Sequence, residues 1–340
     1  MKAKLITDKS NIAYLSDFNG SSGFMLLAGQ NKYLFTDFRY LERATNGTKN
    51  GIKVEDIANW KKILSKHKID TLGIEESNLT LARYKKFKKI SGKIKFIDIS
   101  GEIEAIREIK TDEEIKYTLK SQSINEKVFI EIKKVIQKWY VQKSSTKLYE
   151  IDLAWRIKEL SNKYGANDIS FEPIVAFGAH SALPHHSPGK TALKKGDIVM
   201  IDMGMKYKDY CSDMTRMIFT AKPTKRQTEI YNLVLRAQLE AIKHIRAGMT
   251  GAKADALSRD IIVKAGYGDR YGHAGGHGVG LDIHETPALS VNFKGKLKTN
   301  SIITVEPGIY LPGEFGVRIE DMLLITPRGN KNLTKISKQI

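Results

Sequence analysis

The sequence has little cysteine and no long apolar run, and both absences exclude classes of protein. Cys211 is the single cysteine among 340 residues, so the disulfide framework of a small secreted domain is excluded. No apolar stretch approaches the roughly 20 residues that a membrane-spanning helix needs. The first residues, MKAKLITDKSNIAYL, lack the apolar core and the cleavage site of a signal peptide. We therefore expect a cytoplasmic protein without a membrane partner.

Nucleic-acid and nucleotide motifs are also missing, although the net charge of +18 suggests a nucleic-acid partner. Zinc-finger spacing and ribonucleoprotein aromatic motifs are absent, and so are the phosphate loops GxGxxG and GxxxxGK[ST]. The lysines are scattered, with only short clusters such as KKFKK at 85–89. This distribution is typical of a solvated basic surface, so no nucleic-acid partner is expected.

What is present indicates a globular chain of two domains. Hydrophobic residues make up 41% and charged residues 28% of the 340 residues. A capping box at Thr111–Glu114 begins a helical pattern that extends to about Trp139. We place the domain boundary near the start of this helical pattern, with an α/β domain over 1–115 and a second domain over 116–340. The predicted strands of the first domain are 24–27, 33–36 and 71–74, and its predicted helices are 59–68 and 81–90. Further helices are predicted over 149–163, 224–246 and 253–264.

Two stretches of the second domain align without a gap. They are LKKGDIVMIDMG at 193–204 and LKTNSIITVEPG at 297–308. In each, an apolar strand ends at an acid (Asp202, Glu306), and a second acid follows further on (Asp213, Glu320). Chance alignment of two amphipathic strands is the alternative. Otherwise the pattern predicts internal pseudo-two-fold symmetry, with a site between the two halves.

These four carboxylates form a candidate metal site with a histidine from a glycine-rich stretch. Buried carboxylates are costly unless they are paired or bound to a cation. The stretch GHAGGHGVGLDIHETP at 272–287 supplies the histidine, and its glycines are expected to let the backbone pass close to the ions. One imidazole among oxygen ligands suits Mn²⁺, Co²⁺ or Zn²⁺, and carboxylates can bridge two such ions. The candidate ligands are Asp202, Asp213, His277, Glu306 and Glu320.

The motifs of the second domain resemble those of the pita-bread metallopeptidases, which include methionine aminopeptidase, aminopeptidase P and prolidase. The matching stretches are IDMGMKYKDYCSDMTR (201–216), GHAGGHGVGLDIHETP, TVEPGIY (304–310) and GVRIEDMLLIT (316–326). YLSDFNGSSGFMLL (14–27) and TDFRY (36–40) resemble the creatinase-like N-terminal domain of aminopeptidase P and prolidase, which methionine aminopeptidases lack. The resemblance implies an α+β pita-bread domain after a creatinase-like α/β domain.

The resemblance also implies how the ions are held. Asp202 and Asp213 hold one ion, His277 helps to complete the other, and Glu306 and Glu320 contribute to both.

Further roles follow from the same resemblance. His185 and His284 contact the substrate, His185 near the developing oxyanion, and Glu306 acts as general base. Arg318 orients the carboxylates, and His273 belongs to the structure or to the substrate pocket. His186 could take the place of His185 if the register of the loop SALPHHSPG slips by one residue; otherwise, removing His186 should cost little.

The activity implied is that of an Xaa-Pro aminopeptidase, a homodimer acting on peptides with proline in the second position. A hydroxide activated by two divalent ions, with Mn²⁺ preferred over Co²⁺ or Zn²⁺, attacks the carbonyl before proline. A dipeptidase must bind the free carboxylate of proline, and many prolidases carry an arginine for it in HExPR, where this chain has Ala288. Xaa-Pro dipeptidase remains an alternative, because another cation could bind the carboxylate. The retained metal ligands disfavour three other interpretations. These are a non-catalytic binding protein, a metal-free creatine amidinohydrolase and a Cys211–His nucleophile.

Overall fold

The computed structural model describes residues 1–141 and 146–340, which divide into two compact units, Met1–Arg107 and Glu108–Ile340. The division falls before the boundary predicted after residue 115. The physical reason is that Glu108 and Lys110 make ion pairs within the second unit, with Lys298 at 2.8 Å and Glu285 at 3.0 Å. Among the helices of these described ranges, none combines the length and apolar character needed to cross a membrane.

The first unit is built on a six-stranded sheet. Its strands are β1 (Lys2–Ile6), β2 (Phe24–Ala28), β3 (Asn31–Thr36), β4 (Ile52–Asp56), β5 (Thr71–Ile74) and β6 (Lys95–Asp98). Their order is β4-β3-β2-β1-β5-β6, and β2 is antiparallel to both of its neighbours while the other pairs are parallel. The predicted strands at 24–27, 33–36 and 71–74 are therefore confirmed as β2, β3 and β5.

Helices cover both faces of this sheet. They are α1 (Lys9–Ser16), α2 (Phe38–Gly47), α3 (Trp60–Lys66), α4 (Leu81–Ser91) and α5 (Glu102–Arg107), with a 3-10 turn η1 (Ile57–Asn59) before α3. Apolar side chains of α3 and α4 pack on one face of the sheet, and those of α1, α2 and α5 pack on the other. The result is the three-layer α/β arrangement that the alternating pattern predicted.

The described residues of the second unit form four helices and several small antiparallel sheets. The helices are α6 (Asp112–Val141), α7 (Glu150–Lys163), α8 (Lys225–His244) and α9 (Gly251–Lys264), with 3-10 turns η2 (Gly178–Ala182) and η3 (Gly268–Arg270). The first strands are β7 (Asp168–Ile169), β8 (Ile174–Phe177), β9 (Ile198–Met203), β10 (Met205–Tyr207), β11 (Tyr210–Cys211) and β12 (Met214–Phe219). The later strands are β13 (Gly276–Gly278), β14 (Glu285–Leu289), β15 (Ile302–Val305), β16 (Gly308–Leu311), β17 (Phe315–Arg318), β18 (Asp321–Thr326) and β19 (Gly329–Asn332).

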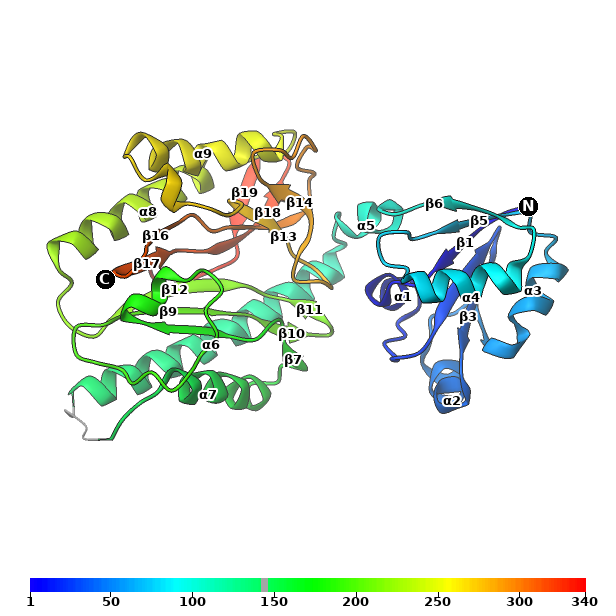
Figure 1. The fold of residues 1–340 in the computed structure, drawn as a ribbon, viewed down its shortest axis with the longest axis horizontal. Coiled ribbons are helices and arrows are strands. Elements are labelled where there is room, and N and C mark those ends of the chain that lie inside the picture. The colour runs from blue at the N-terminus through cyan, green and yellow to red at the C-terminus, as the bar shows by residue number, and fades with distance from the viewer. Residues whose placement is uncertain (142–145) are drawn as a thin grey trace. The chain divides into compact units, whose positions relative to one another are not determined.

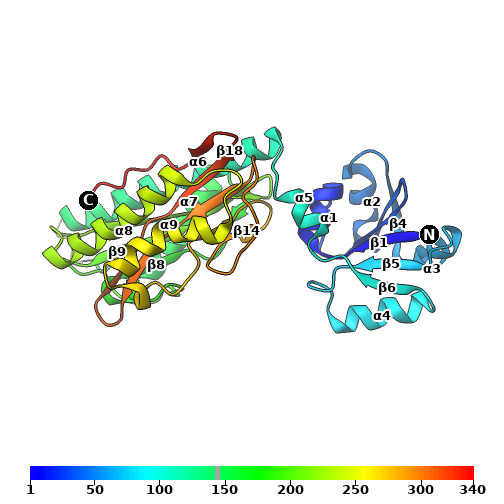
Figure 2. The same cartoon turned by 90° about the horizontal axis from the view of Figure 1, so that it is seen from above.

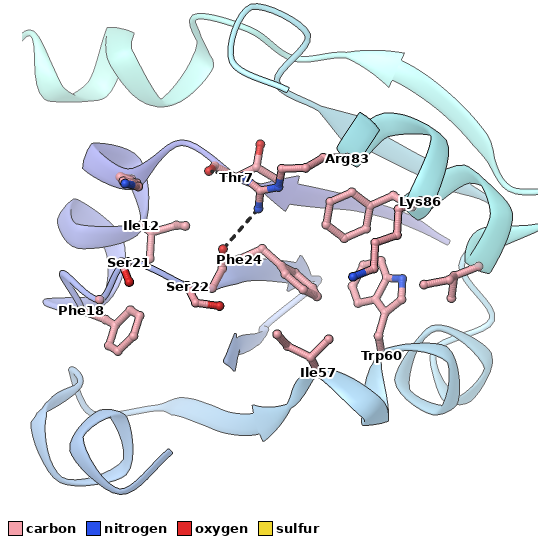
Figure 3. Close-up of a pocket in the computed structure, with 15 residues that line it drawn as sticks. Thr7, Ile12, Phe18, Ser21, Ser22, Phe24, Ile57, Trp60, Arg83 and Lys86 are labelled. Carbon is pink, nitrogen blue, oxygen red and sulfur yellow. Dashed lines mark hydrogen bonds between the residues drawn. The ribbon is translucent and has the colours of Figure 1, made fainter. Parts of the chain in front are cut away.

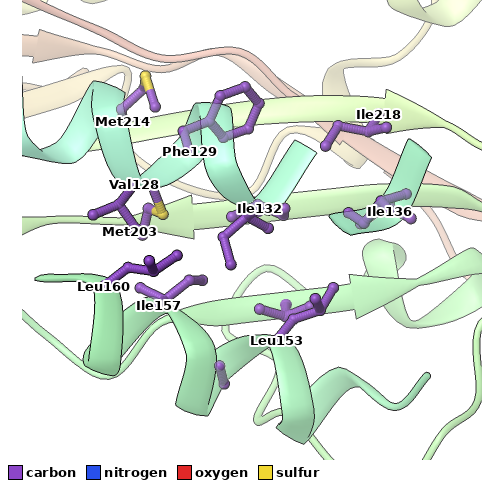
Figure 4. Close-up of a cluster of buried hydrophobic side chains, with 14 of the residues drawn as sticks. Val128, Phe129, Ile132, Ile136, Leu153, Ile157, Leu160, Met203, Met214 and Ile218 are labelled. Atoms are coloured by element: carbon purple, nitrogen blue, oxygen red, sulfur yellow. The ribbon is translucent and has the colours of Figure 1, made fainter. Parts of the chain in front are cut away.

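The sheet β12-β9-β8 is buried on both faces. Figure 1 shows α6 and α7 along one side of it, where their apolar side chains form the cluster drawn in Figure 4. On the other side, Ile198 and Met200 of β9 pack against α8 and the hairpin β16–β17. Figure 2 shows α9 beside α8, and both helices also pack on the sheet β14-β13-β15-β18-β19. Because both faces are covered, β9 reads as a continuous apolar run that ends at Asp202.

The predicted internal symmetry corresponds to two antiparallel strand pairs. β9 pairs with β12, and Asp202 lies near the end of β9 while Asp213 directly precedes β12. β15 pairs with β18, and Glu306 directly follows β15 while Glu320 directly precedes β18. Each pair of strands therefore carries its two acids at the same end.

The predicted capping box at the start of α6 is confirmed. The hydroxyl of Thr111 accepts from the backbone N–H of Glu114 at 3.3 Å, and the Glu114 carboxylate accepts from the backbone N–H of Thr111 at 2.7 Å. The second carboxylate oxygen of Glu114 accepts from the buried hydroxyl of Tyr210 at 2.6 Å. The cap thus fixes the start of α6 against β11.

Candidate active site

The structure brings all five candidate ligands into one pocket of about 570 Å³. The four acids come from the ends of the strand pairs β9–β12 and β15–β18, and the imidazole of His277 comes from β13. The Nε2 atom of His277 lies 3.3 Å from Oε1 of Glu306 and 3.7 Å from Oδ2 of Asp213. Asp213, His277 and Glu320 each offer a ligand atom within 4.8 Å of the others.

The pocket holds more negative charge than its own cations can balance. Burial and then the neighbouring carboxylates raise the pKa of Asp213 and of Glu320 well above their usual range. Burial raises the pKa of Glu306 to about 7, although Arg318 acts in the opposite direction. One carboxylate oxygen each of Asp202, Asp213 and Glu320 has no hydrogen-bond partner among the described residues. Crowded and unpartnered carboxylate oxygens are what divalent cations require, so the residues present fit a metal centre.

His277 is held in the form that a metal ligand needs. Its Nδ1 atom lies 3.1 Å from the carbonyl oxygen of Gly278, to which it donates, so the Nε2 lone pair faces the carboxylates. Its backbone N–H donates to the hydroxyl of Thr304 at 3.0 Å. Burial lowers the pKa of His277, which keeps the ring neutral.

Arg318, at the end of β17, connects the carboxylates to the walls of the pocket. Its guanidinium donates to Asp202 at 2.5 Å, to the Thr215 hydroxyl at 3.0 Å and to the Tyr310 hydroxyl at 2.7 Å. Thr215 in turn donates to Glu320 at 2.7 Å. Sequence reasoning named Arg318 but missed Thr215 and Tyr310. The available signals were that Thr215 lies two residues after Asp213, on the same strand face, and that Tyr310 belongs to the motif TVEPGIY.

His273 forms a neutral wall of the pocket. Its Nδ1 donates to the Ala274 carbonyl at 2.8 Å, so its Nε2 accepts from the Tyr310 hydroxyl at 2.9 Å. Burial lowers the pKa of His273 to about 4. Cys211, by contrast, is buried with its Sγ 3.6 Å from the Leu281 carbonyl, and burial raises its pKa to about 12. Cys211 is therefore a thiol of the core and no nucleophile.

The two neighbouring histidines His185 and His186 have different surroundings. Both line the pocket, but Nε2 of His186 lies 2.9 Å from the fully buried carboxylate of Glu150. The carbonyl of Pro184, on the other side of His185, accepts from Arg318 at 3.2 Å. His185 is thus presented to the pocket between two anchored residues.

Glu150 is an anchor that sequence reasoning missed. Besides the contact with His186, its carboxylate accepts hydrogen bonds from Nδ1 of His180 at 2.8 Å and from the backbone N–H groups of Phe177 at 2.9 Å and Gly189 at 3.2 Å. In the sequence it is an ordinary acid in the first turn of a predicted helix. Only the fold buries it beneath the loop that carries His185.

Two glycines of the histidine-rich stretch allow neighbouring strands to approach closely. A Cβ on Gly276 would lie 2.1 Å from the carbonyl oxygen of Thr304, and one on Gly278 would lie 2.4 Å from that of Thr286. Both neighbours are backbone atoms of adjacent strands. Gly276 and Gly278 therefore let β13 fit between β14 and β15, and the expectation that the glycines bring the backbone close to ions stays a prediction.

Replacement of His186 is expected to destabilise the fold, although the sequence predicts only a small loss of activity. His186→Ala removes a donor from the buried Glu150 carboxylate, which should cost about 1–3 kcal/mol in the free energy of unfolding. Urea unfolding of the metal-free protein measures this cost. His185→Ala is the matched control, since no hydrogen bond holds the His185 side chain among the described residues. Equal stability of the two variants would show that the contact between His186 and Glu150 does not stabilise the fold.

Comparison with known proteins gives the family. Residues 116–327 match the model of metallopeptidase family M24, and residues 1–109 match that of the Creatinase/Prolidase N-terminal domain. The chain is 34% identical to the Xaa-Pro dipeptidase of Pyrococcus horikoshii, over 99% of this chain and 94% of that protein. A solved structure of the Xaa-Pro dipeptidase from Bacillus anthracis matches with a TM-score of 0.93 and 38% identity, over 99% of this chain and 94% of the other. The X-Pro aminopeptidase from Thermotoga maritima matches with a TM-score of 0.89 and 33% identity, over 100% and 97%.

These matches extend through both units and confirm the resemblance seen in the sequence motifs. The fold is the predicted one, and a peptidase assignment is supported over the binding-protein alternative. The chain belongs to metallopeptidase family M24, with a creatinase-like N-terminal domain followed by a pita-bread catalytic domain.

Proposed function

We propose that this metallopeptidase is an Xaa-Pro dipeptidase, which hydrolyses the peptide bond before a C-terminal proline. The observation that carries the proposal is that five metal-ligand side chains share one pocket with His185 and His284. Relatives that match nearly the whole chain are named Xaa-Pro dipeptidases, and this supports the dipeptidase over the aminopeptidase that the sequence favoured.

The same five side chains would hold two divalent ions. Asp202 and Asp213 would hold one, His277 would help to complete the other, and Glu306 and Glu320 would contribute to both. The oxygen-rich set suits Mn²⁺ first, with Co²⁺ or Zn²⁺ as alternatives. When bound, such ions lower the pKa of water toward neutrality and polarise a carbonyl group.

The remaining work falls to side chains of the chain itself. Glu306 accepts the proton of the attacking water, and His185 donates a hydrogen bond to the oxyanion that develops on the scissile carbonyl. The leaving proline nitrogen carries no hydrogen while it is part of the peptide bond, so it must receive a proton. His284 is placed to deliver it, because its exposed ring lies 4.4 Å from the ring of His277 at the mouth of the pocket.

The pocket wall suits a proline ring but offers little to a free carboxylate. Its apolar part includes Phe171, Pro173, Ile174, Pro188 and Ile283. Among the described residues, Arg318 is the only arginine or lysine that lines it, and its guanidinium already donates to Asp202 and Tyr310.

This shortage of cations favours a second candidate, Xaa-Pro aminopeptidase. Ala288 lines the pocket where many prolidases carry an arginine, so nothing at that position neutralises a carboxylate or blocks a longer chain. The T. maritima relative bears the aminopeptidase name.

Hydrolysis of Gly-Pro and Gly-Pro-Pro by Mn²⁺-reconstituted protein separates the two candidates. A dipeptidase has the higher kcat/KM for Gly-Pro. Ala288→Arg should then raise kcat/KM for Gly-Pro further and leave Gly-Pro-Pro without gain, because the new guanidinium pairs only with a carboxylate on the proline. A higher kcat/KM of the parent protein for Gly-Pro-Pro would replace the dipeptidase by the aminopeptidase.

Removal of one acid should separate metal binding from stability. Asp213→Asn should abolish turnover and lower the metal content, measured by elemental analysis after dialysis. The metal-free variant should be at least as stable as the metal-free parent, because one of the mutually repelling carboxylates is gone. Asp209→Asn, an exposed neighbour, is the control that should change neither property. Full activity of the parent after EDTA treatment and dialysis would contradict the metal assignment.

Loss of His185 should affect catalysis alone. His185→Ala should reduce kcat/KM by about 10²–10⁴, the usual contribution of a positioned acid–base or hydrogen-bonding group, with the metal content unchanged. Steady-state kinetics on Gly-Pro, with elemental analysis of the same sample, make the measurement. If His186→Ala loses more activity than His185→Ala at equal folded fraction, the substrate contact belongs to His186.

A further inference from the structure

The first unit contains a cavity of about 340 Å³ that the peptidase chemistry does not use. Thr7, directly after β1, and Ile57, directly after β4, both line it, so it lies at the carboxyl ends of parallel strands. Open α/β sheets bind their ligands at this edge. The volume lies in the range of small-molecule sites.

Aromatic rings form the wall of this cavity. Figure 3 shows Phe18, Phe24 and Trp60 around it, and Phe87 completes the lining. The rings of Trp60 and Phe87 lie 5.1 Å and 5.0 Å from that of Phe24, all three are buried, and they form one rigid group. The indole N–H of Trp60 has no hydrogen-bond partner in the described part of the chain. Such a wall favours a planar apolar molecule.

The charges of the cavity all have one sign. Lys9, Arg83 and Lys86 line it, no aspartate or glutamate does, and among the described residues no acid forms an ion pair with any of the three. Arg83 donates only to the carbonyls of Thr7 at 3.4 Å and Gly23 at 3.3 Å, which are long for hydrogen bonds. Figure 3 shows Arg83 and Lys86 beside Phe24 and Trp60.

We propose that this cavity binds a small aryl carboxylate, with its ring against Phe24, Trp60 and Phe87 and its carboxylate toward Arg83 and Lys86. Arginine and lysine bind carboxylates through charge-assisted hydrogen bonds. An amino acid or a dipeptide is a poor ligand, because its ammonium group would meet three cations and no acid among the lining residues. The ligand is therefore chemically distinct from the substrates and products of a peptidase.

The indole N–H signals of the three tryptophans give a direct test by NMR of the ¹⁵N-labelled, metal-loaded protein. The Trp60 signal is assigned with Trp60→Phe. The probe is 3-phenylpropionate, and the matched ligands are its neutral amide and phenylalanine. Trp139 and Trp155 report on other parts of the chain: Trp139 donates to the Thr146 carbonyl, and Trp155 is exposed on α7.

We expect titration with 3-phenylpropionate to shift the Trp60 signal until it saturates, while the signals of Trp139 and Trp155 stay in place. Lys86→Ala should weaken this binding roughly three- to fivefold, the range of one exposed ion pair. Lys85→Ala, which removes an exposed charge of the same helix outside the cavity, should leave it unchanged. Absence of a saturable Trp60 shift would overturn the proposal. So would equal binding of the amide or of phenylalanine, or equal effects of the two lysine variants.

Discussion

Mutual repulsion among four crowded carboxylates is the constraint on which the catalytic domain depends. The strand pairs β9–β12 and β15–β18 hold the acids together, and the buried pair Arg216–Asp321, at 2.6 Å, supports the same corner. Arg216 also donates to the backbone carbonyl of Glu320 at 2.6 Å, so the position of that acid is fixed from behind. The unfolded chain separates the acids, and repulsion therefore favours unfolding. Divalent cations reverse the balance, because a ligand that binds only the folded state stabilises it by mass action.

In the loop around His185, the residues that fix the position of the loop differ from the residue that is available to a substrate. The side chain of His185 is free of hydrogen bonds to the described residues, and this leaves it available to a substrate. Its neighbours are fixed instead: Arg318 holds the Pro184 carbonyl, and Glu150 holds His186. Since Arg318 also binds Asp202, the metal ligands and the substrate loop share one guanidinium. A change at Arg318 would move both at once.

The sequence allowed the metal site to be predicted because its chemistry is visible locally. An acid that ends a buried apolar strand is costly, and two such strands of equal pattern identify Asp202 and Glu306. The residues that were missed owe their roles to distant neighbours. In the sequence, Glu150 looks like an ordinary acid in the first turn of a helix. Its role depends on the fold, which brings His180 and His186 into contact with it.

The helices α1, α2 and α5 of the first unit were missed for a related reason. α2 buries only Ala44, so its apolar period carries little signal. Its start depends instead on the side chain of Asp37, which accepts a hydrogen bond from the backbone N–H of Arg39.

The choice between dipeptide and longer substrates could not be predicted from the sequence. It depends on all the cations that face the far side of the proline, and the sequence around Ala288 describes only one such position.

The two cavities described above present opposite charges to a ligand, which the net charge of +18 conceals. The pocket of the catalytic domain is lined by five acids, the four candidate ligands and Glu172, whereas the cavity of the first unit is lined by three cations and no acid. In the metal-free state the acids repel any substrate carboxylate, and bound cations remove that repulsion. Metal and substrate binding must therefore favour each other, and linkage makes the effect reciprocal. Coulomb energy falls with distance, so the coupling is larger for a dipeptide, whose carboxylate lies on the proline itself, than for a longer peptide. Dependence of substrate affinity on metal thus rises as the peptide becomes shorter.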